Sequence, residues 1–189
     1  SGKMGFALAE ACAERGAEVT LVAGPVSLKT HHPAIKRIDV ESAGEMYQAA
    51  ITAFPSSDAA ILCAAVADYR PENASEQKIK RETEGEMTLH LVPNPDIAAS
   101  LGAIKREGQV MVGFALETND EATHAEGKLK RKNLDFIVLN SLRDQGAGFR
   151  CDTNKITIID NAGGVTSYPL KTKREVACDI VNKLVTLLK

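Results

Sequence analysis

A short stretch in which an apolar segment meets an acidic residue is the part of this sequence best suited to chemistry. Residues 59–67 (AAILCAAVA) are all apolar, and Asp68 follows them directly. The stretch is typical of a buried parallel strand, and open α/β sheets bind ligands just beyond the carboxyl ends of such strands. Its alanines leave backbone uncovered, against which a planar ring can lie. Lys78 follows in a polar segment. A carboxylate, a bare backbone and a movable lysine together predict a nucleotide pocket with a lid.

Two groups at predicted helix ends favour a ligand that carries phosphate. Ser1 and Gly2 open the segment SGKMG, where free N–H groups and the helix dipole attract an anion. A tight turn that requires glycine is the alternative, and the GxxxxGK[ST] spacing of a P-loop is absent. Lys128 and Lys132 share one face of a predicted helix, where like charges repel by roughly 0.2–0.5 kcal/mol. A bound polyphosphate would reverse this repulsion, and a solvated basic face is the alternative.

Asp96 and Phe114 each have a structural explanation beside a functional one. The segment 94–96 (NPD) is predicted as a helix start, with Asn94 as the N-cap and Pro95 at the first position. Asp96 then stabilises the positive end of the helix dipole, and a ribose or metal role is the less favoured interpretation. Phe114 either stacks on a base or belongs to the core. The four histidines lack the spacing of metal ligands.

A hydride-transferring enzyme is a competing interpretation. The predicted strand over residues 18–23 ends without the carboxylate that usually holds the ribose of NAD, although an NADP site does not require one. No tyrosine is followed by the lysine of the Tyr-x-x-x-Lys pattern expected of short-chain reductases. An NADP-dependent Rossmann oxidoreductase and a non-catalytic nucleotide-binding module therefore stay as alternatives.

Helical and strand patterns alternate along the chain, which predicts an α/β fold in one domain over residues 1–189. The first helix ends at Gly16, and the last begins with a capping box of Thr172 and Glu175. A turn over residues 161–164 (NAGG) predicts a hairpin. The expected helices span 4–15, 43–54, 94–106, 121–132 and 172–188, and the expected strands span 18–23, 59–67, 87–92 (an edge strand), 110–116, 134–139, 155–159 and 165–168.

Composition restricts the function classes open to the chain. Its 189 residues suffice for one α/β core, and a net charge of −2 argues against a strongly basic nucleic-acid binder. The four cysteines form no CxxC pair and are expected to be reduced structural thiols. No apolar stretch approaches the roughly 18 residues of a membrane span, and no signal peptide is evident. We therefore expect a cytoplasmic protein with neither nucleic acid nor membrane as a partner.

Taken in order, these motifs resemble phosphopantothenoylcysteine synthetases, the synthetase half of the bacterial bifunctional coenzyme A biosynthesis proteins. The resemblance extends over nearly the whole chain, and the order of the motifs makes it more specific than any one of them. It implies a Rossmann-like α/β fold, with an open, mainly parallel sheet, helices on both faces and a small β-hairpin extension. The motifs are SGKMG (1–5), AAVADYR (64–70), KIK (78–80), NPDI (94–97), GFALET (113–118) and KLKRKNLD (128–135).

The resemblance implies a ligase of coenzyme A biosynthesis that joins 4′-phosphopantothenate to L-cysteine with CTP. The carboxylate attacks the α-phosphorus to give an acyl-cytidylate and pyrophosphate, and the cysteine amine then displaces CMP. It also implies Mg²⁺ as a cofactor, CTP as co-substrate and no flavin in this chain. A homodimer is expected, with a flavin-dependent decarboxylase fused or associated. The residues themselves leave the choice between CTP and ATP open.

Residue roles are also implied by the resemblance, position by position. Lys78 is expected to be the catalytic residue that closes over the intermediate, and Asp68 and Asp96 are the expected metal ligands. A catalytic asparagine and the first strand are expected upstream of Ser1. The expected nucleotide- and substrate-binding residues are Ser1, Gly2, Leu62, Cys63, Ala64, Asp68, Lys78, Pro95, Asp96, Ile97, Ala98, Phe114, Lys128 and Lys132.

Overall fold

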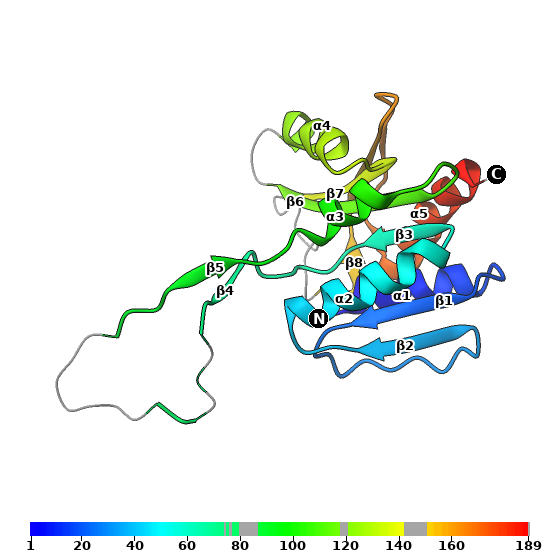
Figure 1. The fold of residues 1–189 in the computed structure, drawn as a ribbon. Coiled ribbons are helices and arrows are strands. Elements are labelled where there is room, and N and C mark those ends of the chain that lie inside the picture. Colours follow the sequence, from blue (N-terminus) through cyan, green and yellow to red (C-terminus); the bar gives the residue numbers. More distant parts are fainter. Residues whose placement is uncertain (74, 76, 80–86, 118–120, 142–150, 189) are drawn as a thin grey trace.

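The structure is a computed structural model and describes residues 1–73, 75, 77–79, 87–117, 121–141 and 151–188. Its central element is a five-stranded sheet in the order β10-β9-β7-β6-β3 (Figure 1). Three neighbouring strands are parallel, namely β3 (Ala59–Leu62), β6 (Val110–Glu117) and β7 (Phe136–Ser141). The sheet is extended by an antiparallel hairpin of β9 (Ile156–Asp160) and β10 (Val165–Ser167). The hairpin predicted around residues 161–164 is therefore confirmed.

A separate pair of parallel strands, β1 (Val19–Ala23) and β2 (Ile35–Asp39), lies beside the first helix. Among the described residues, this pair is not hydrogen-bonded to the five-stranded sheet. The sequence did not predict β2, because a lysine and an arginine interrupt its apolar pattern. The structure shows how Arg37 is accommodated. Its guanidinium lies 5.3 Å from the centre of the Phe6 ring, and it donates a hydrogen bond of 2.5 Å to the carbonyl oxygen of Leu28.

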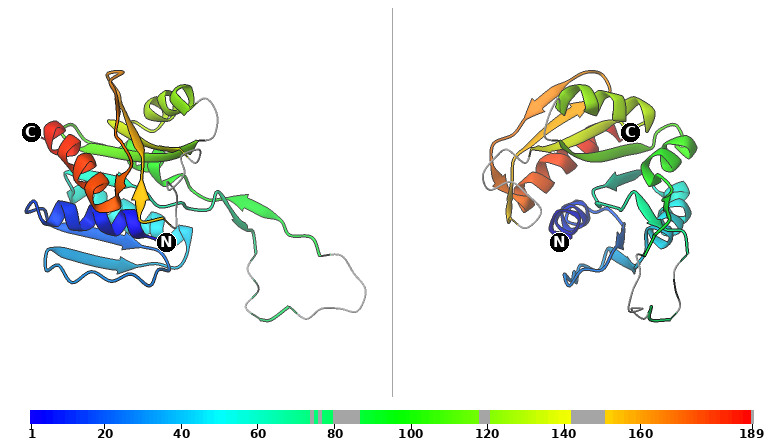
Figure 2. Two further views of the ribbon diagram at one scale, coloured as in Figure 1. Left: turned by 180° about the vertical axis from the view of Figure 1, so that it is seen from behind. Right: turned by 90° about the vertical axis from the view of Figure 1, so that its left-hand side faces the viewer.

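Helices cover both faces of the five-stranded sheet, as the resemblance implies (Figure 2). Helices α1 (Lys3–Ala13) and α5 (Lys173–Leu187) pack against each other and against one face. The other face carries α2 (Ala43–Ala53), α3 (Ile97–Ile104) and α4 (Glu121–Arg131). The side chains of adjacent residues in β6 point to opposite faces of the sheet. Val112 packs in the core beneath α1 and α5, and Met111 packs in the core beneath α2, α3 and α4. Both side chains are fully buried, so the two helical layers shield β6 from water.

The apolar stretch 59–67 does not form one buried strand, which corrects the prediction. Strand β3 ends at Leu62, and the residues beyond it leave the sheet, with Ala64 and Ala65 exposed. In the described structure β3 pairs with β6 alone, so it is an edge strand and its side chains are only half-buried. Alanine also buries little apolar area. An alanine-rich run in the sequence therefore does not distinguish a buried strand from an exposed loop.

The described residues between 69 and 93 form an arm that projects from the body of the molecule (Figure 1). Its base is an antiparallel ribbon of β4 (Tyr69–Pro71) and β5 (Leu91–Pro93). The edge strand predicted over residues 87–92 is wrong in extent, because β5 begins only at Leu91, where it pairs with β4. The arm carries the predicted lid lysine away from the central sheet.

Several predicted element boundaries are confirmed by their capping geometry. Gly16 has a φ of 87° just after α1, in the left-handed region that favours glycine. Thr172 and Glu175 make both hydrogen bonds of a capping box at the start of α5. The remaining short elements are the 3-10 helix η1 (Phe54–Ser56) and the antiparallel pair β8 (Thr153–Asn154) and β11 (Lys171–Thr172).

Candidate active site

Helix α3 begins with Asp96 as its N-cap, and not with Asn94 as predicted. One oxygen of the Asp96 carboxylate accepts a hydrogen bond of 3.0 Å from the N–H of Ala99. Asn94 has a different task. Its backbone N–H donates to the carbonyl oxygen of Asp68 at 2.8 Å, and its side-chain amide donates to that of Ala67 at 2.8 Å. These bonds fasten the segment that follows β3 to the start of α3.

The base of the arm is fixed to the same place. Arg70 donates hydrogen bonds to the carbonyl oxygen of Pro93 at 2.8 Å and to the side-chain oxygen of Asn94 at 3.2 Å. Asn94 thus connects the arm, the chain leaving β3 and the start of α3. The sequence indicated Asn94 as a helix cap only, because the residues that it contacts are distant in the chain.

Lys132, just beyond the end of α4, reaches the start of α3. Its Nζ lies 2.9 Å from one carboxylate oxygen of Asp96 and 3.1 Å from the other. Partial burial raises the pKa of the Asp96 carboxyl, but the hydrogen bond from Ala99 and the charge of Lys132 outweigh burial and hold the pKa below its usual value. An ammonium therefore stands at a helix N-terminus, and both features attract an anion.

Helix α1 approaches the end of β3 from the other face of the sheet. Its N-cap, Gly2, has a φ of 72° and makes no side-chain capping bond. A Cβ on Gly5 would lie 3.2 Å from the Cys63 sulfur, so glycine permits close packing of the helix on the chain that leaves β3. Burial raises the pKa of the Cys63 thiol to about 11, which keeps it neutral. The Cys63 side chain therefore serves as a packing contact for helix α1.

The structure gathers most of the predicted binding residues at the carboxyl ends of β3 and β6. Leu62 is the last residue of β3 and pairs with Gly113, next to Phe114 in β6. The side chain of Phe114 is half-buried against the cluster that includes α1 and α5. Lys128, on α4, is also half-buried. The residues that lie on the segments meeting here are Gly2, Leu62, Cys63, Ala64, Asp68, Pro95, Asp96, Ile97, Ala98, Phe114 and Lys132.

Lys78 is not brought to this group. It is exposed and belongs to residues 77–79, in the outer part of the arm beyond β4 (Figure 1). The arrangement therefore separates the predicted catalytic lysine from Asp96 and Lys132 within one chain.

The predicted magnesium ligands do not form a ready metal site. Among the described residues, no group of three or more histidine, cysteine, aspartate or glutamate side chains is placed to hold a metal ion. Both oxygens of Asp96 already contact the Lys132 ammonium, and one also caps α3. Asp68 is exposed. Its role in holding magnesium stays a prediction.

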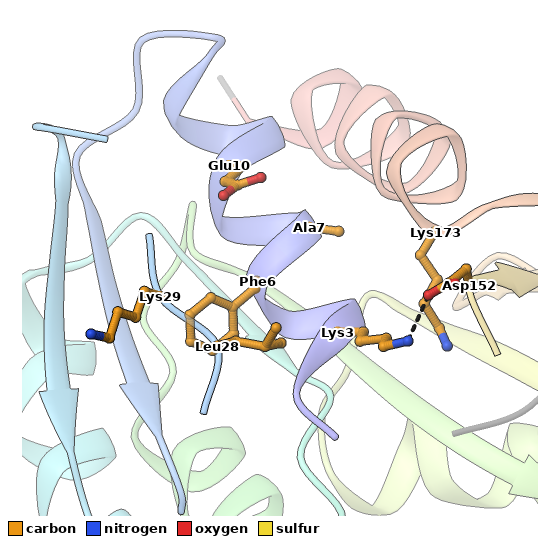
Figure 3. Close-up of a pocket in the computed structure, with 8 residues that line it drawn as sticks. All are labelled: Lys3, Phe6, Ala7, Glu10, Leu28, Lys29, Asp152 and Lys173. Atoms are coloured by element: carbon orange, nitrogen blue, oxygen red, sulfur yellow. Dashed lines mark hydrogen bonds and ion pairs between the residues drawn. The ribbon is translucent and has the colours of Figure 1, made fainter. Parts of the chain in front are cut away.

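An open hollow lies elsewhere on the molecule, between α1 and the start of α5 (Figure 3). Its volume is about 330 Å³, and Lys3 and Asp152 form an ion pair of 2.6 Å at its edge. Burial, followed by the nearby charge of Lys3, lowers the pKa of Lys173 beside this pair. None of the predicted nucleotide-binding residues lines the hollow, whose lining residues are Lys3, Phe6, Ala7, Glu10, Leu28, Lys29, Asp152 and Lys173.

Asn140 is a polar residue of the same sheet edge that the sequence did not single out. It lies near the carboxyl end of β7, opposite Leu116 of β6. Its side-chain oxygen is buried and has no hydrogen-bond partner among the described residues. A polar residue that interrupts the apolar run FIVL was the available signal.

Comparisons with known proteins place this geometry in a family. Residues 1–188 match the family described as the DNA/pantothenate metabolism flavoprotein C-terminal domain. The chain is 44% identical over 188 residues to the coenzyme A biosynthesis bifunctional protein CoaBC of Escherichia coli K12, which covers 98% of this chain and 46% of that protein. It is 57% identical over 188 residues to a cysteine/cysteine sulfinic acid decarboxylase of an unknown prokaryotic organism, covering 100% of this chain and 52% of that protein. The chain thus spans about half the length of these relatives.

A solved structure supports the same assignment. The crystal structure of the C-terminal domain of a CoaBC protein superposes with a TM-score of 0.82 at 35% identity, over 99% of this chain and 83% of that one. The match confirms both the Rossmann-like α/β fold and the resemblance to the synthetase half of the bifunctional coenzyme A proteins. The chain therefore belongs to the family of DNA/pantothenate metabolism flavoprotein C-terminal domains.

Proposed function

We propose that residues 1–189 form one ligase domain, which joins 4′-phosphopantothenate to L-cysteine with CTP in coenzyme A biosynthesis. The observation that carries the proposal is the meeting of Lys132 with Asp96 at the N-terminus of α3, 2.9 Å apart. The start of α3 is hydrogen-bonded to the segment around Asp68. Backbone N–H groups and an ammonium at the carboxyl edge of a sheet suit a nucleotide triphosphate.

The proposed reaction has two steps. A carboxylate oxygen of 4′-phosphopantothenate bonds to the α-phosphorus of CTP, and the bond from that phosphorus to the bridging oxygen breaks, which releases pyrophosphate. The cysteine amine then attacks the acyl carbon, loses a proton and displaces CMP. Both steps bring anions together, so the protein contributes chiefly by positioning the reactants and neutralising charge. Mg²⁺ accompanies CTP as a counter-ion of its phosphates.

The residues at the sheet edge divide this work. Lys128 and Lys132 neutralise the triphosphate, and the first N–H groups of α3 bind it. Phe114 flanks the base, and the backbone at Leu62 to Ala64 lies against the nucleoside. Ser1 and Gly2, at the N-terminus of α1, bind a phosphate of the substrate or nucleotide. Asp68 contacts the nucleotide from the segment after β3. Lys78 neutralises the acyl-cytidylate when the arm brings it to the site.

The arm also supports the expected homodimer. Its large apolar side chains are unusually exposed, with Met87 at 65% and Tyr69 at 62%. Exposed apolar patches of this kind mark protein interfaces, and an exposed ribbon edge pairs readily with another strand. We propose that the arms of two copies pack together and that this contact brings Lys78 to a nucleotide. The exposed apolar residues of the arm are Tyr69, Ile79, Met87, Leu89 and Leu91.

The wider setting is proposed from the relatives. Because this chain covers about half of each, a flavin-dependent decarboxylase is the expected fused or associated partner. No helix in the described part of the chain is long and apolar enough to cross a membrane. All four cysteines are free, as is usual in a reducing compartment. We therefore propose a cytoplasmic enzyme.

The test is a substrate-omission assay on this chain and on the full-length protein encoded by its gene. We expect pyrophosphate when CTP, Mg²⁺ and 4′-phosphopantothenate are present, and CMP with phosphopantothenoylcysteine only after cysteine is added. Mass spectrometry identifies the products. If the chain binds CTP but releases no pyrophosphate in any mixture, the result favours a non-catalytic nucleotide-binding module. Tight binding of NADPH would favour an NADP-dependent oxidoreductase. Release of carbon dioxide from cysteine alone would favour an activity like that named for the relative at 57% identity.

A further inference from the structure

The end of helix α4 has a geometry that directs one carbonyl group away from the helix. Asn133 has a φ of 51°, and the N–H of Leu134 donates to the carbonyl oxygen of Leu129 at 3.0 Å. The N–H of Asn133 donates to the carbonyl oxygen of Lys130 at 3.4 Å. These bonds form a Schellman motif with asparagine in the left-handed position. Lys132 is the residue just before it.

The carbonyl of Lys132 lies directly against Gly102 in the middle of α3. A Cβ on Gly102 would be 2.2 Å from the Lys132 oxygen and 2.8 Å from its carbonyl carbon. These are backbone atoms, so no rotamer change relieves the overlap. Glycine is a poor residue for a helix interior, and α3 has only eight residues. The close approach of the two backbones explains its presence.

Three polar contacts hold the helices together at this place. The side-chain amide of Asn133 donates to the carbonyl oxygen of Gly102 at 3.0 Å. Lys105, the C-cap of α3, donates to the carbonyl oxygen of Asn133 at 3.2 Å and pairs with Asp135 at 2.6 Å. The backbone just after Lys132 is therefore fixed relative to α3.

The side chain of Lys132 extends from this fixed point to the N-cap of the same helix. Its ammonium contacts Asp96, which lies about 9 Å of helix axis before Gly102. We infer that Gly102 is a positioning residue: the absence of a side chain there sets the place of the Lys132 ammonium at the N-terminus of α3. This inference rests on the proposed function, in which that ammonium neutralises the phosphates of CTP.

The decisive variant is Gly102→Ala. Its methyl group forces the Lys132 carbonyl to retreat by about 1.2 Å to reach ordinary contact distance. Misplacement of about 1 Å costs up to about 100-fold in function, and loss of a hydrogen bond to a charged group costs about 10- to 100-fold in affinity. We expect calorimetric titration with CTP to give a Kd raised at least tenfold by Gly102→Ala and about 10- to 100-fold by Lys132→Ala.

The matched control is Gly127→Ala, in α4 itself. A Cβ there has no neighbour within 4 Å among the described residues. Alanine favours a helix over glycine, so we expect wild-type CTP affinity and an equal or higher thermal midpoint.

A double variant separates positioning from general damage. If Gly102 acts through Lys132, Gly102→Ala adds no further loss of CTP affinity in the Lys132→Ala background. Equal losses in both backgrounds would overturn the inference, as would wild-type affinity in a folded Gly102→Ala protein. A wild-type chain that does not bind CTP would instead overturn the proposed function.

If Gly102→Ala does not fold, Asn133→Gly provides the test. Glycine keeps the left-handed position but removes the amide bond to Gly102. We expect it to weaken CTP binding about three- to tenfold while the thermal midpoint stays close to that of the wild type, and unchanged binding would overturn the inference.

Discussion

Replacing Lys105 by methionine should destabilise the protein by leaving a carboxylate buried without its ammonium. The side chains of Lys105 and Asp135 are 10% and 19% exposed, and they pair at 2.6 Å. Breaking one side of a fully buried pair costs about 3–5 kcal/mol. Asp135 keeps a 2.6 Å hydrogen bond from the N–H of Met111 and some contact with water. We therefore expect a loss of about 2–3 kcal/mol in the free energy of unfolding.

Urea unfolding followed by circular dichroism measures this loss, and the thermal midpoint should fall by about 5–10 °C. Lys36→Met is the matched control, because Lys36 is exposed on β2, and it should stay within about 0.5 kcal/mol of the wild type. Adding Asp135→Asn to Lys105→Met should restore most of the stability, since the amide oxygen still accepts from Met111 without a buried charge. A loss for Lys105→Met no larger than that of the control would refute this reasoning.

Three further outcomes follow from the same structure. Asp96→Ala should cost about 1 kcal/mol through the lost N-cap. Folding lowers the pKa of Asp96, so its ionised carboxylate stabilises the folded protein at pH values above the unfolded pKa. This stabilisation is lost as the pH falls through the lower folded pKa. The urea midpoints of wild type and variant should therefore converge in acid. Cys63 should resist iodoacetamide near neutral pH and react only as the pH approaches about 11, which mass spectrometry of the labelled peptide checks. Leu91→Asp should convert the expected dimer to monomer in sedimentation velocity without a change in circular dichroism, since Leu91 is exposed on the arm; a variant that stays dimeric would exclude the arm as the interface.

Elements with agreeing local signals were predictable from the sequence. Helix α5 has a capping box at its start and apolar residues at helical spacing, and the hairpin of β9 and β10 has a glycine-containing turn between alternating strands. In both cases the information lies within a few residues of the element. Long-range contacts only add to a preference that is already present.

Strands β2 and β3 show where that information ends. Arg37 gives β2 a polar appearance, although the Asp39 carboxylate pairs with its charge and the Phe6 ring and the Leu28 carbonyl contact its guanidinium. The alanine-rich continuation of β3 looks buried, but the chain leaves the sheet after Leu62, and Ala64 and Ala65 are exposed. Whether each segment forms a strand depends on which other segment lies beside it. A local sequence pattern does not show which segment that is.

The candidate site divides in the same way. Its residue types were found by their motifs, because Asp68, Asp96 and Lys132 stand in sequences typical of the family. Their contacts were not, since Lys132 and Asp96 are 36 residues apart and Asn94 reaches Ala67 across 27 residues. The role of Gly102 could not be predicted from the sequence either, because glycine is required there by the close approach of the Lys132 backbone, 30 residues further along the chain. The motifs therefore identify the residues of the candidate site, but long-range packing determines which of these residues contact one another.

The carboxylate of Asp96 holds the Lys132 ammonium before any ligand arrives. An incoming phosphate at this place exchanges one anion for another and does not meet a bare cation, so the net electrostatic gain on binding is smaller. In the proposed reaction the same exchange runs backwards after turnover, when the carboxylate recaptures the ammonium as pyrophosphate leaves. If the proposed function holds, this ion pair lowers the affinity for the nucleotide and speeds the departure of a highly charged product.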